Sequence, residues 1–113
     1  MHNRYCLTLD LKDDPKLIAE YEAYHRAVWP EVLKSIRDAG ILNMEIYRFA
    51  NRLFMIMDVN ESFSFEAKAA ADEANETVQK WEQLMSQFQQ VLPGTSPDDK
   101  WRWKRMDRVF SLA

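Results

Sequence analysis

YEAYHRAVWP, residues 21–30, is the segment around which the rest of the chain is arranged. If this segment is helical, Tyr21, His25 and Trp29 are spaced four residues apart and share one face. Apolar side chains extend that face in both directions: Leu17, Ile18, Val28, Val32, Leu33 and Ile36. The pattern predicts an amphipathic helix with a histidine in the middle of its apolar stripe.

Pro30 is the second unusual feature of this segment. A proline lacks the backbone donor and disturbs the preceding turn, which here holds His25 and Trp29. The sequence leaves open whether Pro30 kinks the helix or splits it in two. A titratable ring beside a helix break, flanked by aromatic side chains, would suit a pocket. The alternative is an ordinary histidine satisfied within the core.

The first half of the chain predicts one strand and one helical region. Residues 4–11 alternate between apolar and polar side chains, as expected of a half-buried strand. Asp14 is suited to cap a helix whose first residue is Pro15. This helical region extends to Gly40, which is placed to end it.

The second half predicts a hairpin, a second helical region and a closing strand. The elements are strands over 41–49 and 53–59, two helical pieces within 61–92 (the second from about residue 74), a polar loop over 95–100 and a strand over 103–110. The short link between the first two strands favours an antiparallel hairpin.

The predicted order is βαββαβ, an α+β fold with helices on one face of a mainly antiparallel sheet. The strands carry bulky side chains that suggest a cover on the second face as well: Tyr47, Phe54, Met55, Met57, Trp103 and Phe110. A partner subunit is the simplest cover. We therefore expect a homodimer, with each chain forming half of a dimeric α+β barrel.

Composition limits the class of protein. A length of 113 residues predicts a single domain, residues 1–113. The net charge of -3 gives no basis for binding nucleic acid, and no apolar run approaches a membrane span. A single cysteine, Cys6, and the lack of a signal-peptide pattern favour the cytoplasm. Two histidines and one cysteine do not form a metal-ligand set, so no metal site is predicted.

The segment around His25 resembles the first helix of the L-rhamnose mutarotase family. The resemblance is carried by a His-x-x-x-Trp-Pro-Glu run, residues 25–31, with a tyrosine four residues before the histidine. Further similarities follow in order along nearly the whole chain: residues 43–47, Leu53-Phe54, residues 79–81, Leu92-Pro93 and Val109-Phe110.

The resemblance implies a ferredoxin-like protomer in a dimeric barrel without a metal or organic cofactor. The implied reaction interconverts the α and β anomers of a 6-deoxy-hexose. By matched position, His25 is the proton donor, Tyr21 a sugar-binding partner that orients or shares the proton, and Trp81 an aromatic sugar contact. Trp29 and Tyr47 are weaker candidates for the apolar wall of the site.

Two positions depart from the family pattern. Met44 occupies the place of a sugar-binding tyrosine, and Glu82 occupies the place of a second tryptophan. The loss of a hydroxyl and an aromatic face, together with a new carboxylate, should change which sugar hydroxyls the pocket recognises. These departures favour L-fucose slightly over L-rhamnose.

Two other classes fit the same architecture, because fold alone does not decide function. One is a small oxygenase, either cofactor-free or with His25 as the axial ligand of a haem. The other is a dimeric binding module whose aromatic pocket holds a metabolite without reaction.

Overall fold

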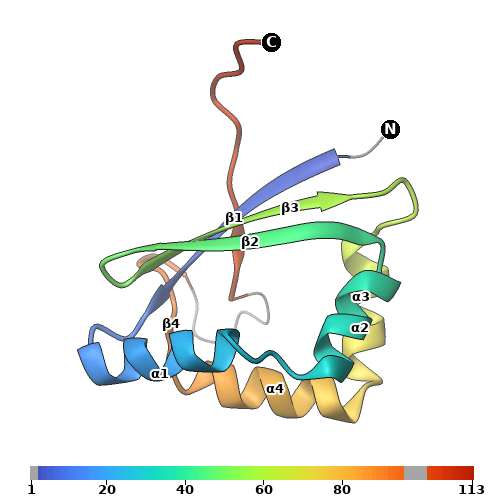
Figure 1. Ribbon diagram of the computed structural model, residues 1–113. Coiled ribbons are helices and arrows are strands. Elements are labelled where there is room, and N and C mark those ends of the chain that lie inside the picture. Colours follow the sequence, from blue (N-terminus) through green and yellow to red (C-terminus); the bar gives the residue numbers. More distant parts are fainter. Residues whose placement is uncertain (1–2, 96–101) are drawn as a thin grey trace.

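A sheet and a layer of helices make up the fold, and all four helices lie on one side of the sheet (Figure 1). The computed structural model describes residues 3–95 and 102–113. Its elements are β1 (Asn3–Leu11), α1 (Pro15–His25), α2 (Pro30–Asp38), β2 (Ile41–Phe49), β3 (Arg52–Val59), α3 (Phe65–Glu73), α4 (Glu76–Ser86), β4 (Gln89–Gln90) and β5 (Lys104–Arg105). The predicted α+β fold with helices on one face of an antiparallel sheet is confirmed.

The sheet has the strand order β2-β3-β1-β4, and β5 also pairs with β1. Every pairing is antiparallel, so directly opposed residues share a face. Leu9 of β1 lies opposite Leu53 of β3, and both are almost completely buried beneath the helices. Ile46 of β2 lies opposite Met55 of β3 on this same face. The core therefore lies between the sheet and the helical layer.

Pro30 splits the first helical region in two. The Asp14 side chain accepts hydrogen bonds from the backbone of Lys16 and Leu17, which confirms the predicted start of α1. The residue before a proline is driven out of the helical region, and Trp29 accordingly has the extended angles φ -57° and ψ 135°. α1 thus ends at His25, and α2 begins with Pro30 as its first residue.

Gly40 ends α2, as the sequence predicted. Its φ of +96° is in the left-handed region, where a side chain is disfavoured. A Cβ at this position would also collide with the side-chain oxygen of Asn60. Both features require glycine at the turn that leads into β2.

Three predicted elements are wrong in extent. The helical piece predicted from residue 61 begins only at Phe65, because Ser64 caps it. Residues 87–92 are not helical, because the chain turns after Ser86 and pairs Gln89 and Gln90 with β1. The predicted strand over 103–110 is reduced to Lys104–Arg105, which pairs only with Leu7 and Thr8. The backbone of Met106 still donates to the carbonyl of Cys6, at 2.8 Å, and the chain then leaves the sheet edge. Of the predicted polar loop, residues 96–100 lie outside the described residues.

The two faces of the sheet differ in how well they are covered. Met55 and Met57 face the helices and are buried, and Trp103 packs against the core between the sheet and the helices. This corrects the inclusion of all three in an uncovered second face. Tyr47 and Phe54 are opposed across β2 and β3 on the other face, where Tyr47 is 54% exposed. The described part of this chain has no helix on that face (Figure 1).

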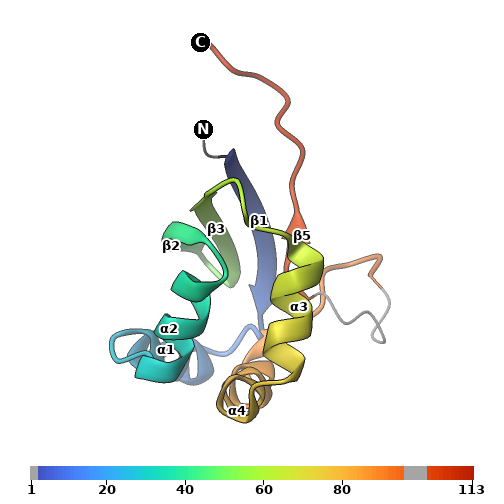
Figure 2. The same cartoon turned by 90° about the vertical axis from the view of Figure 1, so that its right-hand side faces the viewer.

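The C-terminal arm, residues 106–113, extends away from the helical layer in both views (Figures 1 and 2). It has no regular secondary structure. Three apolar side chains of the arm are exposed: Val109 at 96%, Phe110 at 75% and Leu112 at 93%.

Replacement of Leu9 by alanine tests the location of the core. Leu9 is 0% exposed, so Leu9→Ala should lower the free energy of unfolding by about 2–5 kcal/mol. Leu42→Ala, at a position 61% exposed, is the control and should change it by less than about 0.5 kcal/mol. Urea denaturation followed by circular dichroism measures both. Equal losses in the two variants would contradict this placement of the core.

Candidate functional site

Trp81 lies at the centre of an aromatic cluster between α1, α2 and α4. Its ring is 5.6 Å from that of His25, 5.1 Å from that of Trp29 and 6.4 Å from that of Tyr24, measured between ring centroids. We call this group the His25 cluster; its members are Tyr21, Tyr24, His25, Trp29, Trp81 and Phe88. Four side chains singled out in the sequence, Tyr21, His25, Trp29 and Trp81, are thus brought together.

His25 is held in a defined orientation by the residue one turn before it. The Tyr21 ring lies 4.3 Å from the imidazole between centroids, and the Tyr21 carbonyl oxygen is 2.9 Å from His25 Nδ1. A carbonyl oxygen can only accept, so Nδ1 carries the hydrogen of this bond. In the neutral imidazole, Nε2 is then the nitrogen with the free lone pair. This arrangement leaves His25 able to accept a proton at Nε2.

Burial lowers the pKa of His25 below its ordinary value of 6.5, partly opposed by the hydrogen bond to the Tyr21 carbonyl. The cause is the loss of solvation, which penalises the charged imidazolium. His25 is therefore neutral near pH 7, in the form that accepts a proton.

The Tyr21 hydroxyl keeps its proton near neutral pH. Burial raises the pKa of its hydroxyl to about 12, while a hydrogen bond with the Gln89 side chain acts in the other direction. The hydroxyl is thus protonated near neutral pH and is not itself a base. Gln89 reaches this position because β4 pairs with Leu11 of β1. Tyr21 positions His25 through its ring and its carbonyl.

Three other predicted site residues lie outside the His25 cluster. Met44 packs in a neighbouring core group with Met57 and Ile41. Glu82 follows Trp81 on α4, but its side chain accepts from Gln79 at 3.4 Å. Its pKa is raised, first by desolvation and then by the charge of Asp72.

Tyr47 lies on the sheet face opposite the helices. The sequence predicted it as a weaker wall residue, and the fold of one chain does not bring it to His25.

Sequence reasoning missed three residues that complete the arrangement. Tyr24 and Phe88 pack against each other, with 5.9 Å between ring centroids, and Gln89 contacts the Tyr21 hydroxyl. Tyr24 could have been found from its place within the segment 21–30. Phe88 and Gln89 were hidden because residues 87–92 were predicted to continue a helix.

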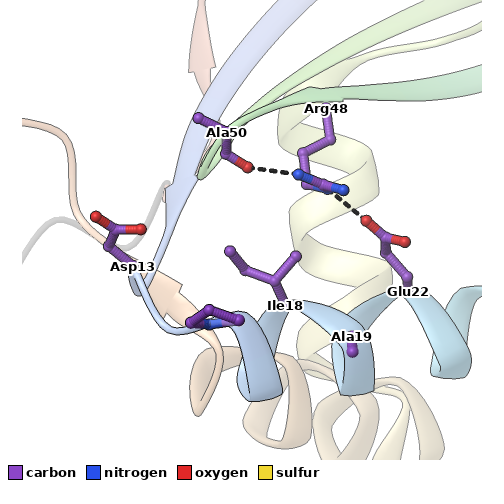
Figure 3. Close-up of a pocket in the computed structure, with 7 residues that line it drawn as sticks. Asp13, Ile18, Ala19, Glu22, Arg48 and Ala50 are labelled. Atoms are coloured by element: carbon purple, nitrogen blue, oxygen red, sulfur yellow. Dashed lines mark hydrogen bonds and ion pairs between the residues drawn. The ribbon is translucent and has the colours of Figure 1, made fainter.

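A surface hollow of about 340 Å³ opens beside α1, next to the hairpin of β2 and β3 (Figure 3). Its lining consists of Asp13, Pro15, Ile18, Ala19, Glu22, Arg48 and Ala50. Two of these, Ile18 and Glu22, precede His25 on α1 by seven and three residues. The hollow therefore borders the same helix face that carries His25.

Comparison with known proteins identifies the family of this chain. The sequence profile described as L-rhamnose mutarotase matches residues 4–112. The L-fucose mutarotase of Xanthomonas campestris pv. campestris is 48% identical over 112 residues, which cover 97% of this chain and 88% of that protein. The chain belongs to the L-rhamnose mutarotase family.

Two further mutarotases support this membership. The L-rhamnose mutarotase of Phocaeicola vulgatus is 34% identical over 85 residues, covering 74% of this chain and 78% of that protein. The crystal structure of an L-rhamnose mutarotase from Formosa agariphila superposes with a TM-score of 0.70 at 25% identity. The match covers 98% of this chain and 99% of that one, so the described part of this chain has the fold of that mutarotase.

Residues 3–95 and 102–113 contain neither a membrane-spanning helix nor a cluster of metal-ligating side chains. No helix in these ranges is both long and apolar enough to cross a membrane. The same ranges contain no group of three or more His, Cys, Asp or Glu side chains that could hold a metal ion.

The lowered pKa of His25 can be measured directly. We expect its imidazole resonances to titrate with a pKa below 6.5, because burial disfavours the charged form. Proton NMR between pH 4 and 8 measures the value, and His25→Gln assigns the signal. Protonation should also weaken the fold: stability is complete above about pH 6.5 and declines as pH falls toward the lowered pKa. A pKa at or above 6.5 would contradict the described burial.

Proposed function

We propose that this protein interconverts the α and β anomers of a 6-deoxy-hexose, and that L-fucose is preferred over L-rhamnose. The observation that carries this proposal is His25, neutral and oriented with Nε2 free, within an aromatic cluster. Family membership supports the reaction class, since mutarotases are isomerases of sugar anomers.

The chemistry requires one group that can move a proton in both directions. Ring opening transfers a proton from the C1 hydroxyl to the ring oxygen, so no proton is consumed overall. Nε2 of His25 accepts the proton of the C1 hydroxyl. The resulting imidazolium donates this proton to the ring oxygen, which is also bonded to C1. The open aldehyde then rotates about the C1–C2 bond and closes on the other face. Such proton transfer typically contributes about 10²–10⁴-fold to the rate.

The remaining members of the cluster bind and orient. Trp81 is buried in the cluster and Trp29 packs against it; their flat apolar rings are of the kind that stacks on the C–H face of a sugar. Tyr21 holds the imidazole in place and, as a neutral hydroxyl, can donate a hydrogen bond. We retain Met44, Glu82 and Tyr47 as weaker candidates for sugar contacts, on the basis of the family pattern alone.

The preference for L-fucose is supported by the relatives. The L-fucose mutarotase of Xanthomonas campestris pv. campestris shares 48% of its residues with this chain, against 34% for the L-rhamnose mutarotase of Phocaeicola vulgatus. By the family pattern, Met44 stands where a tyrosine would supply a hydroxyl to the sugar, and the lack of that hydroxyl should change which sugar is preferred.

We further propose that the protein is a homodimer. The sheet face that carries Tyr47 and Phe54 lacks a helical cover among the described residues. The C-terminal arm extends away from the helices with Val109, Phe110 and Leu112 exposed. A second copy that covers the open face and receives the arm would bury both. A cytoplasmic location fits the free thiol of Cys6, which suits a reducing compartment.

Removal of the imidazole tests the reaction. His25→Ala should reduce anomer exchange of L-fucose by at least about 10²-fold, because the proton carrier is lost. Saturation-transfer NMR at the anomeric protons measures exchange, and circular dichroism checks the fold. Lys16→Ala, at an exposed position in the first turn of α1, is the control and should exchange sugar normally. Normal exchange by His25→Ala would refute the assignment.

Removal of the apolar side chains from the arm tests the dimer. A variant with Val109, Phe110 and Leu112 all replaced by serine should dissociate at least about 100-fold more readily, since the burial of three such side chains is lost. Sedimentation velocity over a range of concentrations measures dissociation. A monomeric unmodified chain would contradict the homodimer, and an unchanged dissociation constant in the variant would contradict the role of the arm.

A further inference from the structure

Glu22 and Arg48 form an ion pair that joins the helical layer to the sheet. Arg48 Nε donates to the Glu22 carboxylate, and Arg48 Nη1 donates to the Ala50 carbonyl oxygen at 2.8 Å (Figure 3). The Arg48 side chain is 38% exposed, and the Glu22 side chain is 43% exposed. The pair is therefore held in place and remains accessible to a ligand.

The pair lies beside His25 along α1. Glu22 precedes His25 by three residues, so their side chains are neighbours on the helix surface. Arg48 lies opposite Leu53 of β3, on the sheet face that the helices cover. It follows Ile46 by two residues, about 7 Å along β2, and Ile46 packs against the core group that contains Tyr21 and Trp81.

The hollow beside α1 gives access to both members of the pair. Glu22 and Arg48 line it together with apolar atoms of Ile18 and Ala19 (Figure 3). The hollow is open to solvent and has a volume of about 340 Å³. His25 does not line the hollow, but it follows Glu22 by three residues, about one helical turn along α1.

The two members of the pair add charged hydrogen-bonding groups to the neutral groups of the His25 cluster. A pyranose presents several hydroxyls, each of which both donates and accepts a hydrogen bond. The carboxylate of Glu22 accepts, and the guanidinium of Arg48 donates in a fixed geometry. The aromatic rings offer apolar faces and cannot distinguish the orientation of one hydroxyl from another.

We propose that Glu22 and Arg48 bind the ring hydroxyls of the sugar remote from C1 and determine which 6-deoxy-hexose is accepted. This inference rests on the proposed mutarotase function. Two other arginine–carboxylate pairs, Arg4–Asp58 and Arg52–Asp10, connect β1 to β3 on the opposite face of the sheet. They have no comparable position relative to His25.

The test compares Arg48→Met and Glu22→Gln with the unmodified protein. The KM for L-fucose should rise about 10-fold or more in each variant, because a hydrogen bond to a charged group is lost. The kcat should stay nearly constant, because His25 is untouched. NMR exchange measured over a range of L-fucose and L-rhamnose concentrations separates KM from kcat, and the ratio of the two sugars should change. Lys34→Met, which removes an ion pair on α2, is the control and should leave KM unchanged.

A purely structural role of the ion pair between Glu22 and Arg48 predicts a different result. If the pair only anchors α1 to the hairpin, the melting temperature falls while KM and the ratio of sugars stay the same, and the inference is overturned. Should Arg48→Met fail to fold, Arg48→Lys retains the charge without the two-headed donor and is expected to raise KM likewise. An absence of exchange by the unmodified protein overturns the proposed function itself. Normal exchange with unchanged KM in the variants overturns this inference alone.

Discussion

The backbone restriction imposed by Pro30 determines the geometry of the site. Because the residue before a proline is disfavoured in the helical region, Trp29 is extended and α1 ends at His25. His25 therefore occupies the last turn of its helix, where no further helical turn covers the ring. Trp29 leaves the face that it would share with Tyr21 and His25 in a continuous helix, yet its ring still contacts Trp81 from the start of α2.

Burial has opposite effects on the two titratable rings of the site. It raises the pKa of the Tyr21 hydroxyl and lowers that of the His25 imidazole, so both groups are neutral near pH 7. Their roles differ as a result: the hydroxyl can donate a hydrogen bond, and the imidazole can accept a proton at Nε2. One apolar environment thus assigns a proton carrier and a positioning residue, since burial is the largest cause of both pKa shifts.

The two faces of the sheet have different surroundings in the described part of the protomer. On the covered face, the strands supply the core and present Arg48 toward α1. On the other face, Tyr47 and Phe54 lie without a helical cover, and the C-terminal arm extends away from the helices. Alternation of side chains along each strand allows one hairpin to serve both faces.

The sequence by itself determined the βαββ order of the first half of the chain and the two helical pieces that follow it. It also determined the alternation of faces along β1, the cap at Asp14 and the end of α2 at Gly40. These features depend on short-range periodicity and on backbone preferences that neighbouring residues already express. Family resemblance also singled out Tyr21, His25 and Trp81, which the fold brings together.

Only the tertiary structure decided what depends on distant partners. Residues 87–92 have no local signal that overrides a helix, and it is pairing with β1 that draws Gln89 to the Tyr21 hydroxyl. The strand predicted over 103–110 stops at Arg105 because it pairs with only two residues of β1. The contact between Glu22 and Arg48 likewise joins side chains 26 residues apart, and no pattern along either element could reveal it.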